Sequence, residues 1–374
     1  MVRPPVNSVD LFLLAGEPSG DLQGAALVEE LLKENPGLRI TAVAGPRMRK
    51  FPIQCVEKME NLQVMGFIDV LCALPKIARM FFSLRHKILE LNPKAFVGLD
   101  YPGFNLRLHR SLKKAGFKGK LIHYICPTVW AWGKGRIPQM AKTLDLLLTI
   151  LPFEPACFAK TSLRVEYVGH PLTQAVAKFR PDPEFRKRHG FANTDKILAL
   201  FPGSRAKEIE RNLPLQLEVA RKLQKQDPDL RIAISAANDQ VQGIPLDEAY
   251  DLMHNAHLAL AKSGTVTLEL ALHRVPTVIH YAIKPLDMFL ATRVFNIRLP
   301  YYGLPNLILG KEVFPELFGP NLTLKALESQ SSALWFEEPF RSACTALCEE
   351  LRAILCDQAA SRDAALQILN AITI

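Results

Sequence analysis

Residues 257–269 read His-Leu-Ala-Leu-Ala-Lys-Ser-Gly-Thr-Val-Thr-Leu-Glu. The apolar run at 257–261 predicts a buried strand, and the residues after the Ser-Gly-Thr turn predict a helix. Small residues between a strand and a helix let an anion such as a diphosphate approach the N–H groups of the helix start. The stretch therefore predicts a βα unit with an anion-binding loop at Ser263, Gly264 and Thr265.

Glu269 lies one to two turns into the predicted helix. A carboxylate at this position can accept both hydroxyls of a ribose if the loop holds the diphosphate of a nucleotide. The plainer interpretation is an ordinary helix cap at Ser263 or Thr265, with Glu269 in solvent. The sequence leaves both interpretations of Glu269 open.

A second loop of the same kind, Pro202-Gly203-Ser204-Arg205, follows the apolar run 197–201. Its Gly-Ser pair exposes N–H groups at a helix start, and the guanidinium of Arg205 can bind two phosphate oxygens at once. One such loop is a weak signal, whereas two loops in one domain are considerably stronger. The sequence therefore predicts a phosphate site in the second half of the chain.

Apolar runs alternate with helical patterns along most of the 374 residues, which predicts an α/β protein with parallel sheets. The rhythm pauses over 169–190, a segment rich in proline and charge that we interpret as a hinge. Since a domain usually holds about 100–200 residues, we expect two doubly wound, Rossmann-like domains that face each other across a cleft. The predicted strands cover 10–15, 39–44, 95–99, 120–124, 145–150, 164–168, 197–201, 231–235, 257–261 and 277–281.

The first half of the chain carries carboxylates in the loops that follow two predicted strands. Ligands of open α/β sheets bind outside the carboxyl ends of the strands, so these loops are candidates for chemistry. Glu17 lies in the loop Gly16–Asp21, in which Ser19 or Asp21 could simply cap the next helix. Asp100 follows the strand at 95–99, and its alternative is an Asx turn before Pro-Gly. We favour a functional Asp100.

A basic stretch from Lys76 to Lys120 holds eleven Lys or Arg against two acids, an excess equal to the formal net charge of +9. It follows an apolar segment at 65–82, in which Pro75 is expected to interrupt any long helix. An apolar wedge beside basic residues is typical of a protein that lies on an anionic membrane. Burial in the core is the alternative for the five apolar residues of this wedge, which are Ile68, Val70, Leu71, Leu74 and Ile77.

Several classes of protein are disfavoured. Seven scattered cysteines without a Cys-x-x-Cys pair favour reduced thiols, and neither a signal peptide nor an apolar run long enough to span a membrane is evident, which together predict a cytoplasmic protein. The basic stretch lacks the interleaved aromatic residues of a nucleic-acid site. Asp227-Pro228-Asp229 spells a metal-binding D-x-D motif but precedes a strand, so we interpret it as a surface turn and expect no metal site.

In this order, the motifs resemble those of the lipid-A-disaccharide synthase family, which are glycosyltransferases of the GT-B architecture. The Val-Trp-Ala-Trp and Leu-Pro-Asn-Leu pieces are far more specific than any glycine loop. The carrying segments are Ala15–Asp21, Val64–Gly66, Val97–Asp100, Pro127–Trp132, Leu151–Glu154, Pro202–Arg205, Ser263–Thr265 with Leu268–Glu269, Lys284–Pro285 and Leu304–Leu307. The sequence departs from the family at Gly103, where an acid is usual.

The resemblance implies an inverting transfer of the sugar of UDP-2,3-diacylglucosamine to 2,3-diacylglucosamine 1-phosphate. The products would be UDP and a β(1→6) disaccharide 1-phosphate, a step of lipid A biosynthesis that needs no cofactor. Asp100 would be the catalytic base, with Glu17 in reserve, and Ser19 would lie on the acceptor side. The UDP-binding residues would be Ser204, Arg205, Ser263, Gly264, Thr265 and Glu269, with Tyr281 and Asn306 nearby.

The resemblance also implies a domain arrangement and partners. The acceptor domain would comprise 1–170 plus about 340–374, and the UDP-sugar domain 171–339. We expect the partners to be the two lipid substrates and the inner face of the cytoplasmic membrane, with a homodimer left open and no nucleic acid. The alternatives are another GT-B enzyme acting on UDP-sugars, either a peptidoglycan-precursor glycosyltransferase or an epimerase, and a non-catalytic protein that binds lipid precursors.

Overall fold

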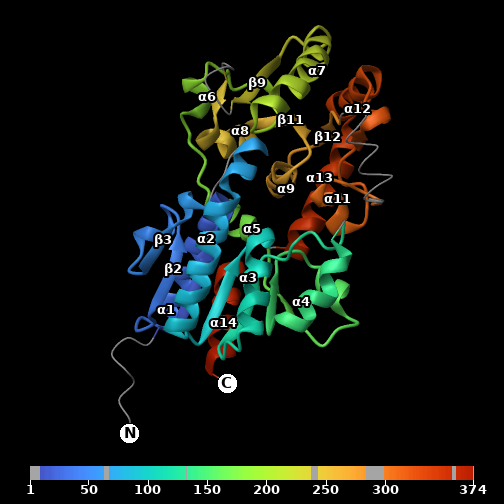
Figure 1. The fold of residues 1–374 in the computed structure, drawn as a ribbon. Coiled ribbons are helices and arrows are strands. Elements are labelled where there is room, and N and C mark those ends of the chain that lie inside the picture. The colour runs from blue at the N-terminus through green and yellow to red at the C-terminus, as the bar shows by residue number, and fades with distance from the viewer. Residues whose placement is uncertain are drawn as a thin grey trace. The chain divides into compact units, whose positions relative to one another are not determined.

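The computed structural model describes residues 9–62, 67–131, 133–236, 243–283, 299–355 and 359–373, with only the backbone at 67–74 and 236. The chain divides into two compact units (Figure 1). Unit 1 comprises Met1–Pro171 and Gln358–Ile374, and unit 2 comprises Leu172–Asp357. The chain therefore returns to unit 1 at 358, later than the residue near 340 expected from the sequence.

Unit 1 contains a seven-stranded sheet in the order β3-β2-β1-β4-β5-β6-β7, and its strand pairs are parallel. This order reverses between β1 and β4, as in doubly wound folds. Its elements are β1 (Leu11–Ala15), α1 (Pro18–Glu34), β2 (Ile40–Ala44), η1 (Met48–Lys50), β3 (Gln54–Lys58), η2 (Met59–Asn61), α2 (Phe67–Leu91), β4 (Ala95–Leu99), α3 (Pro102–Lys114), β5 (Lys120–Tyr124), η3 (Lys134–Arg136), α4 (Ile137–Thr143), β6 (Leu146–Thr149), η4 (Pro155–Phe158), β7 (Arg164–Tyr167) and α14 (Ala360–Thr373).

Unit 2 repeats the plan with a six-stranded sheet in the order β10-β9-β8-β11-β12-β13, also parallel, which reverses between β8 and β11. Its first helix begins at the boundary between the units. The elements are α5 (Pro171–Lys178), α6 (Phe185–Arg188), β8 (Lys196–Phe201), α7 (Ala206–Gln224), β9 (Leu230–Ala236), β10 (Ile244–Pro245), η5 (Leu246–Glu248), α8 (Ala249–Asn255), β11 (Ala256–Lys262), α9 (Thr265–Leu272), β12 (Thr277–Tyr281), α11 (Leu304–Leu309), β13 (Glu316–Phe318), η7 (Gly319–Asn321), α12 (Leu324–Phe336) and α13 (Glu338–Leu355).

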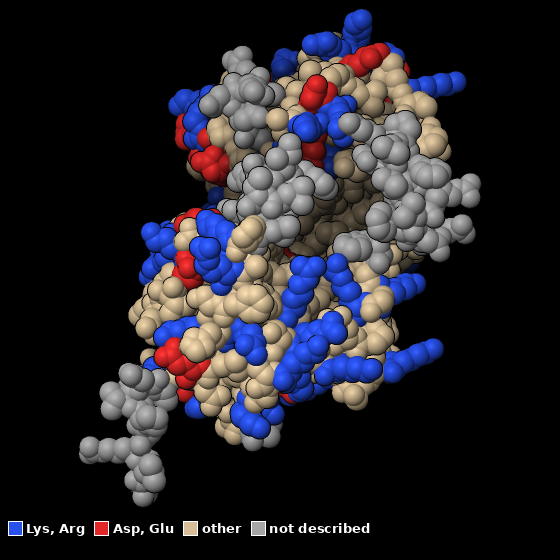
Figure 2. Space-filling model, viewed as in Figure 1, with Lys and Arg blue, Asp and Glu red and all other residues tan. Residues whose placement is uncertain are grey.

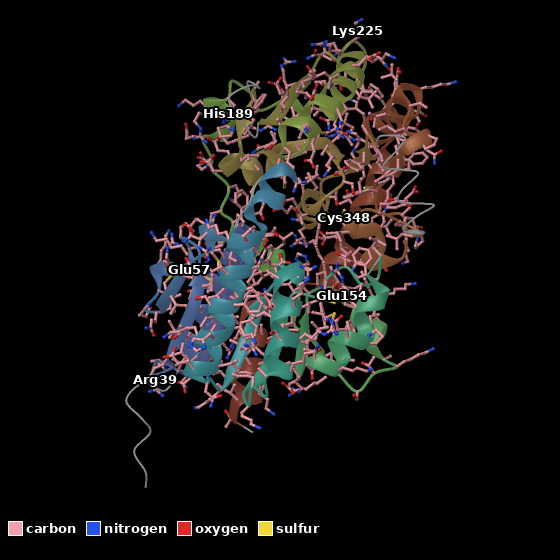
Figure 3. The ribbon with its side chains drawn as sticks, in the orientation of Figure 1. Arg39, Glu57, Glu154, His189, Lys225 and Cys348 are labelled. Atoms are coloured by element: carbon pink, nitrogen blue, oxygen red, sulfur yellow. The ribbon has the colours of Figure 1, made fainter. Side chains whose placement is uncertain are left out.

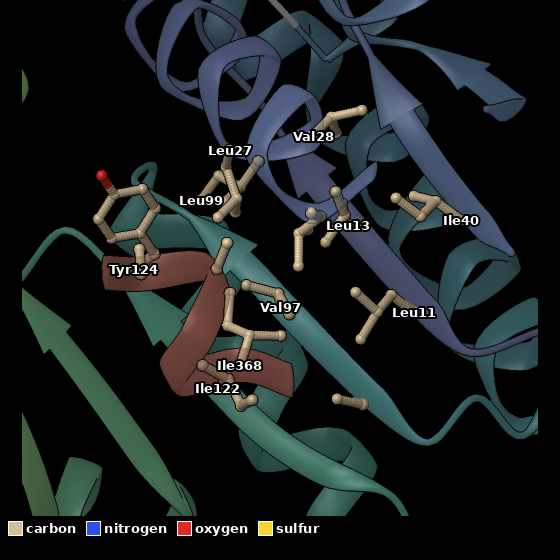
Figure 4. Packing of buried hydrophobic residues seen from close by; sticks show 14 of the residues in the cluster. Leu11, Leu13, Leu27, Val28, Ile40, Val97, Leu99, Ile122, Tyr124 and Ile368 are labelled. Atoms are coloured by element: carbon tan, nitrogen blue, oxygen red, sulfur yellow. The ribbon is translucent and has the colours of Figure 1, made fainter. Parts of the chain in front are cut away.

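The central strands β1 and β4 of unit 1 contain no polar side chain, because both faces of the sheet are covered by helices. In β1, Leu11 and Leu13 face the core beneath α1 and α14, whereas Phe12 and Leu14 face the core beneath α2 and α3. Figure 4 shows Ile368 of α14 packed among the side chains of this sheet. This alternation follows from the two-residue period of a strand.

The expected break at Pro75 is wrong, because α2 is a continuous helix of 25 residues with Pro75 inside it. A proline within a helix removes a single backbone hydrogen bond. The C-terminal half of α2 is anchored to unit 1 by the buried residues Leu84 and Ile88. Packing of the amphipathic helix therefore outweighs the local cost of Pro75.

Candidate functional site

The four loops singled out from the sequence fall in pairs at the two points where the strand order reverses. In unit 1, the loop with Glu17 follows β1 and the loop with Asp100 follows β4, and these strands are neighbours. In unit 2, the loops with Arg205 and Ser263 follow the neighbouring strands β8 and β11. Such reversal points are where doubly wound sheets bind their ligands.

Asp100 is held in an unusual backbone conformation. It has φ of 49° and the next residue, Tyr101, has φ of 48°, so two successive residues are left-handed. The turn is fixed by the Asp100 N–H, which donates to the Tyr124 carbonyl at 2.9 Å, and by Asn105 Nδ2, which donates to the Asp100 carbonyl at 2.8 Å. Left-handed residues outside glycine are uncommon and gather at functional sites. The geometry thus supports Asp100 as a site residue.

Ser19 and Asp100 are brought together. Ser19 Oγ donates to Asp100 Oδ2 at 3.0 Å. Gly16 also belongs to this cluster, because a Cβ there would overlap the ring of Tyr101. Burial, together with the negative charge of Glu17, raises the pKa of Tyr101, so Glu17 lies near the same ring. The first loop and the Asp100 loop therefore form one polar cluster in unit 1.

Asp21, the other candidate cap in the first loop, has a structural role. Its buried carboxylate accepts hydrogen bonds from the Arg47 N–H at 2.9 Å and the Met48 N–H at 3.1 Å. A carboxylate occupied in this way anchors the start of η1 and is not free to act on a substrate.

Glu154 is a buried acid that the sequence placed in a motif but gave no role (Figure 3). Its Oε2 accepts from the N–H groups of Ile150 at 3.2 Å and Leu151 at 3.0 Å. Burial raises the pKa of Glu154 to about 7, although these bonds and a hydrogen bond from the Trp130 side chain act in the opposite direction. Glu154 thereby ties the loop after β6 to the Val-Trp-Ala-Trp segment.

In unit 2, Glu208 and Lys262 connect the two phosphate-type loops. Lys262 Nζ lies 3.1 Å from Glu208 Oε1, and the side chains are only 18% and 13% exposed. Glu208 Oε2 accepts a hydrogen bond from the Ser204 N–H at 3.2 Å. The preceding residue, Gly203, has a φ of +123°, a conformation that favours glycine. Burial opposes ionisation of Glu208, but Lys262 and the Ser204 N–H bring its pKa below the usual value.

Lys262 also lies over the ring of Tyr281, 4.9 Å from its centroid. The sequence analysis gave no role to Glu208 or Lys262. The signal that could have found them is their position, since Lys262 is the last residue of β11 and Glu208 lies in the first turn of α7. The carboxyl ends of the neighbouring strands β8 and β11 therefore bring these two residues together.

The predicted phosphate ligands are available on the surface of unit 2. The Arg205 side chain is 83% exposed and makes only a long contact of 3.4 Å with Glu208. Ser204, Gly264 and Thr265 are exposed, and Ser263 is half-buried, with its N–H bonded to the His280 carbonyl at 3.0 Å. Among the described residues, no atom lies within 4 Å of a Cβ built on Gly264, so these residues leave open space at the start of α9.

The plainer interpretation placed Glu269 in solvent, but the structure encloses part of this side chain. It is half-buried, and its Oε1 accepts from the Tyr250 hydroxyl at 3.0 Å. Burial raises the pKa of Glu269, and the Tyr250 hydrogen bond opposes that rise. A ribose contact by Glu269 stays a prediction, and it would have to use the oxygen that Tyr250 leaves open.

Asn306 lies in α11. Its fully buried amide donates to the Phe314 carbonyl at 2.7 Å and to Glu316 Oε1 at 2.8 Å, and its oxygen accepts from the N–H groups of Val313 and Phe314, each at 2.9 Å. This uses both donors and both acceptor sites of the amide. Asn306 therefore supports the loop that precedes β13. A contact of this residue with UDP stays a prediction and would have to displace one of these bonds or use another atom of the residue.

We expect Asn306→Ala to lower the free energy of unfolding by about 3 kcal/mol, because it leaves several buried backbone groups without partners. Urea unfolding should detect the loss, with exposed Asn193→Ala as the control in the same unit. Unchanged stability with weakened UDP binding would assign Asn306 to the ligand instead.

The apolar wedge is only partly described. The side chains of Ile68, Val70, Leu71 and Leu74 lie outside the described residues. Ile77 is half-buried and packs against the core beneath α2 and α3, whereas Phe82 is 64% exposed. None of the helices in the described ranges is sufficiently long and apolar to span a bilayer. Ile77 thus belongs partly to the core, and contact of the other four with lipid stays a prediction.

The fold and the paired loops define a two-unit α/β protein of the GT-B type. Solved structures agree on the fold at low sequence identity. A glycosyltransferase of kitacinnamycin matches with a TM-score of 0.62 and 14% identity, covering 97% of this chain and 99% of that chain. A UDP-GlcNAc 2-epimerase from Neisseria meningitidis bound to UDP-GlcNAc matches with a TM-score of 0.58 and 10% identity, with the same coverage of 97% and 99%.

Sequence comparison is more specific than the fold. The lipid-A-disaccharide synthetase family profile matches residues 11–368. A lipid-A-disaccharide synthase of Rhodospirillum centenum is 36% identical over 97% of this chain and 94% of its own length. One of Chlamydia trachomatis serovar D is 38% identical over 85% of this chain. The chain spans about half of that relative's length, namely 54%. The chain belongs to the lipid-A-disaccharide synthetase family.

Proposed function

We propose that the protein transfers the sugar of UDP-2,3-diacylglucosamine to 2,3-diacylglucosamine 1-phosphate, giving the β(1→6) disaccharide 1-phosphate and UDP. The observation that carries this proposal is the pairing of the four loops at the reversal points of the two sheets, in a chain of this family. One reversal point presents a carboxylate and the other presents phosphate-type loops. A glycosyl transfer from a nucleotide needs both.

In the proposed inverting reaction, the 6-hydroxyl of the acceptor attacks the anomeric carbon of the donor. Asp100 accepts the hydroxyl proton, the new C–O bond forms, and the bond to UDP breaks, with its electrons leaving on the diphosphate. The Ser19 hydroxyl orients the carboxylate through Oδ2, which leaves Oδ1 for the proton. Glu17 is the reserve base in the same cluster.

The leaving diphosphate gains one negative charge as the bond to the sugar breaks, and this charge must be stabilised in the transition state. We assign this role to Arg205, the Ser204 and Ser263 loops, and the open start of α9 at Gly264 and Thr265. Lys262 adds a second cation and is held in place by Glu208. Glu269 and Tyr281 would border the nucleoside.

We expect Arg205→Ala to lower the transfer rate by about 10² to 10³, because preorganised charge at a developing anion supplies stabilisation of this size. UDP affinity, measured by calorimetry, should also fall. Lys225→Ala, at the far end of α7 (Figure 3), is the matched control and should change neither. Normal UDP affinity and turnover in Arg205→Ala would remove Arg205 from the site.

Both proposed substrates carry acyl chains, so the protein must meet a lipid surface. We propose that the apolar wedge and the basic stretch of unit 1 contact the inner face of the cytoplasmic membrane peripherally. Figure 2 shows Lys and Arg side chains gathered over the part of unit 1 that carries α3 and α4. Anionic headgroups attract such residues by about 1 kcal/mol each.

A further inference from the structure

A cavity lies between α3 and α4 of unit 1. Its volume is about 150 Å³, which is several times the space that one water molecule requires. Pro102, Gly103 and Leu106 line it from α3, and Met140 and Thr143 line it from α4. Pro102 and Gly103 follow Asp100 by two and three residues, so the cavity adjoins the loop of the proposed base.

Two guanidinium groups border the cavity, those of Arg107 on α3 and Arg136 at the end of η3. Arg107 is exposed and Arg136 is half-buried. Within the described ranges, no carboxylate forms an ion pair with Arg107. A planar guanidinium donates two parallel hydrogen bonds to a phosphate, so two of them around one cavity suit a doubly charged phosphate monoester.

Gly103 borders the cavity. Among the described residues, no atom lies within 4 Å of a Cβ built at this position, so the space beside Gly103 is open. Gly103 has no side chain, so this position places no carboxylate in the lining that would compete with a bound anion. The cavity of this chain therefore has two cations in its lining and no carboxylate among its lining residues.

We propose that this cavity binds the phosphate monoester of the acceptor sugar. The inference rests on the proposed function, because it takes the acceptor to be a sugar 1-phosphate. The acceptor must present one hydroxyl to Asp100, and its phosphate lies across the same sugar ring. Asp100 precedes α3 and Gly103 lies in its first turn, so the proposed base and the anion site are carried by the same end of α3. Arg107 and Arg136 then select phosphorylated acceptors and orient the attacking hydroxyl.

The test compares two acceptors, 2,3-diacylglucosamine 1-phosphate and 2,3-diacylglucosamine, in wild type and in Arg107→Gln. We expect wild type to prefer the phosphorylated acceptor in kcat/KM, and Arg107→Gln to lose about tenfold or more of that preference. Turnover of the unphosphorylated acceptor should fall less than that of the phosphorylated one, because only the latter offers a phosphate to Arg107. Lys142→Gln, an exposed cation on α4 outside the lining, is the matched control and should keep the wild-type preference.

A preference that is the same in Arg107→Gln and wild type would overturn the proposal. The other possible source of phosphate is a lipid headgroup, which is tested by sedimentation with vesicles that contain anionic phospholipid. Vesicle binding that falls in Arg107→Gln while the acceptor preference persists would assign the cavity to lipid headgroups and also overturn it.

A direct binding measurement separates this proposal from the proposed function. Calorimetry with glucosamine 1-phosphate and with glucosamine needs no turnover. We expect only the phosphorylated sugar to bind, about tenfold or more weakly in Arg107→Gln. If wild type makes no disaccharide but shows this binding difference, the proposed function fails and the anion site stands. If wild type makes disaccharide but binds the two sugars equally, the anion site fails alone.

Discussion

Asp100→Asn should abolish most disaccharide formation, lowering kcat by about 10² to 10⁴, because the amide cannot accept the proton of the attacking hydroxyl. The substitution keeps the shape of the side chain, and its oxygen can still accept from Ser19 Oγ. Asparagine also tolerates the left-handed backbone at this position, where φ is 49°. The fold should therefore survive, and the loss should be chemical.

UDP binding separates a chemical loss from a structural one. Asp100 belongs to unit 1 and the proposed UDP loops belong to unit 2, so calorimetric UDP affinity should match wild type in Asp100→Asn. Asp247→Asn, at an exposed position, is the control and should leave both rate and affinity unchanged. Normal turnover of Asp100→Asn would transfer the role of base to Glu17, and Glu17→Gln would then be the inactive variant.

Acidification should destabilise both units, because each contains buried neutral histidines. Burial lowers the pKa of His123 in unit 1 to about 4 and that of His280 in unit 2 to about 4, and it lowers the pKa of His109 further, with His123 contributing. Among the described residues, neither ring nitrogen of His109 or His123 has a hydrogen-bond partner. These rings therefore resist protonation in the folded state.

The sign follows from proton binding. The unfolded chain takes up protons at these histidines below about pH 6.5, whereas folded His123 and His280 do so only near pH 4. Stability is therefore complete above pH 6.5 and falls as the pH drops toward 4. At about 1.4 kcal/mol per unit of pKa, each of these two histidines costs its unit about 3 kcal/mol by pH 4.

His123→Leu should flatten this dependence. In urea unfolding followed by circular dichroism, wild type should lose about 2 kcal/mol more than the variant between pH 6.5 and pH 5.0, since only wild type has this buried proton site. His86→Leu, at an exposed position on α2, should keep the wild-type slope. Equal slopes for wild type and His123→Leu would contradict the buried-histidine account.

The strands that could be predicted are those buried on both faces. The strands predicted at 95–99, 120–124 and 277–281 match β4, β5 and β12 residue for residue. β4 is an unbroken apolar run, and β5 and β12 each contain a buried pair of neighbouring aliphatic residues. Of the strands in the described ranges, three were missed. β3 is a largely exposed edge strand of sequence Gln-Cys-Val-Glu-Lys, β10 has two residues including a proline, and β13 has three residues. None of them has an apolar run to detect.

For the site, the position of a residue after a strand was enough to predict several candidates. The contacts that each side chain makes could not be predicted from the sequence. Glu17, Asp100, Arg205 and Ser263 could be found because catalytic and binding residues gather after strands. The Glu208–Lys262 pair and the enclosed amide of Asn306 depend on contacts between segments far apart in the chain. Asn306 was assigned to UDP because it lies in a family motif, and only the structure shows that its hydrogen bonds are used within the loop.

The most direct test of the central claim incubates the purified chain with UDP-2,3-diacylglucosamine and 2,3-diacylglucosamine 1-phosphate and analyses the products by mass spectrometry. The account predicts a tetraacyl disaccharide 1-phosphate and one UDP for each disaccharide formed, with both products formed about 10² to 10⁴ times more slowly by Asp100→Asn. UDP without disaccharide, a changed sugar still linked to UDP, or no reaction from a folded protein that binds UDP would contradict it.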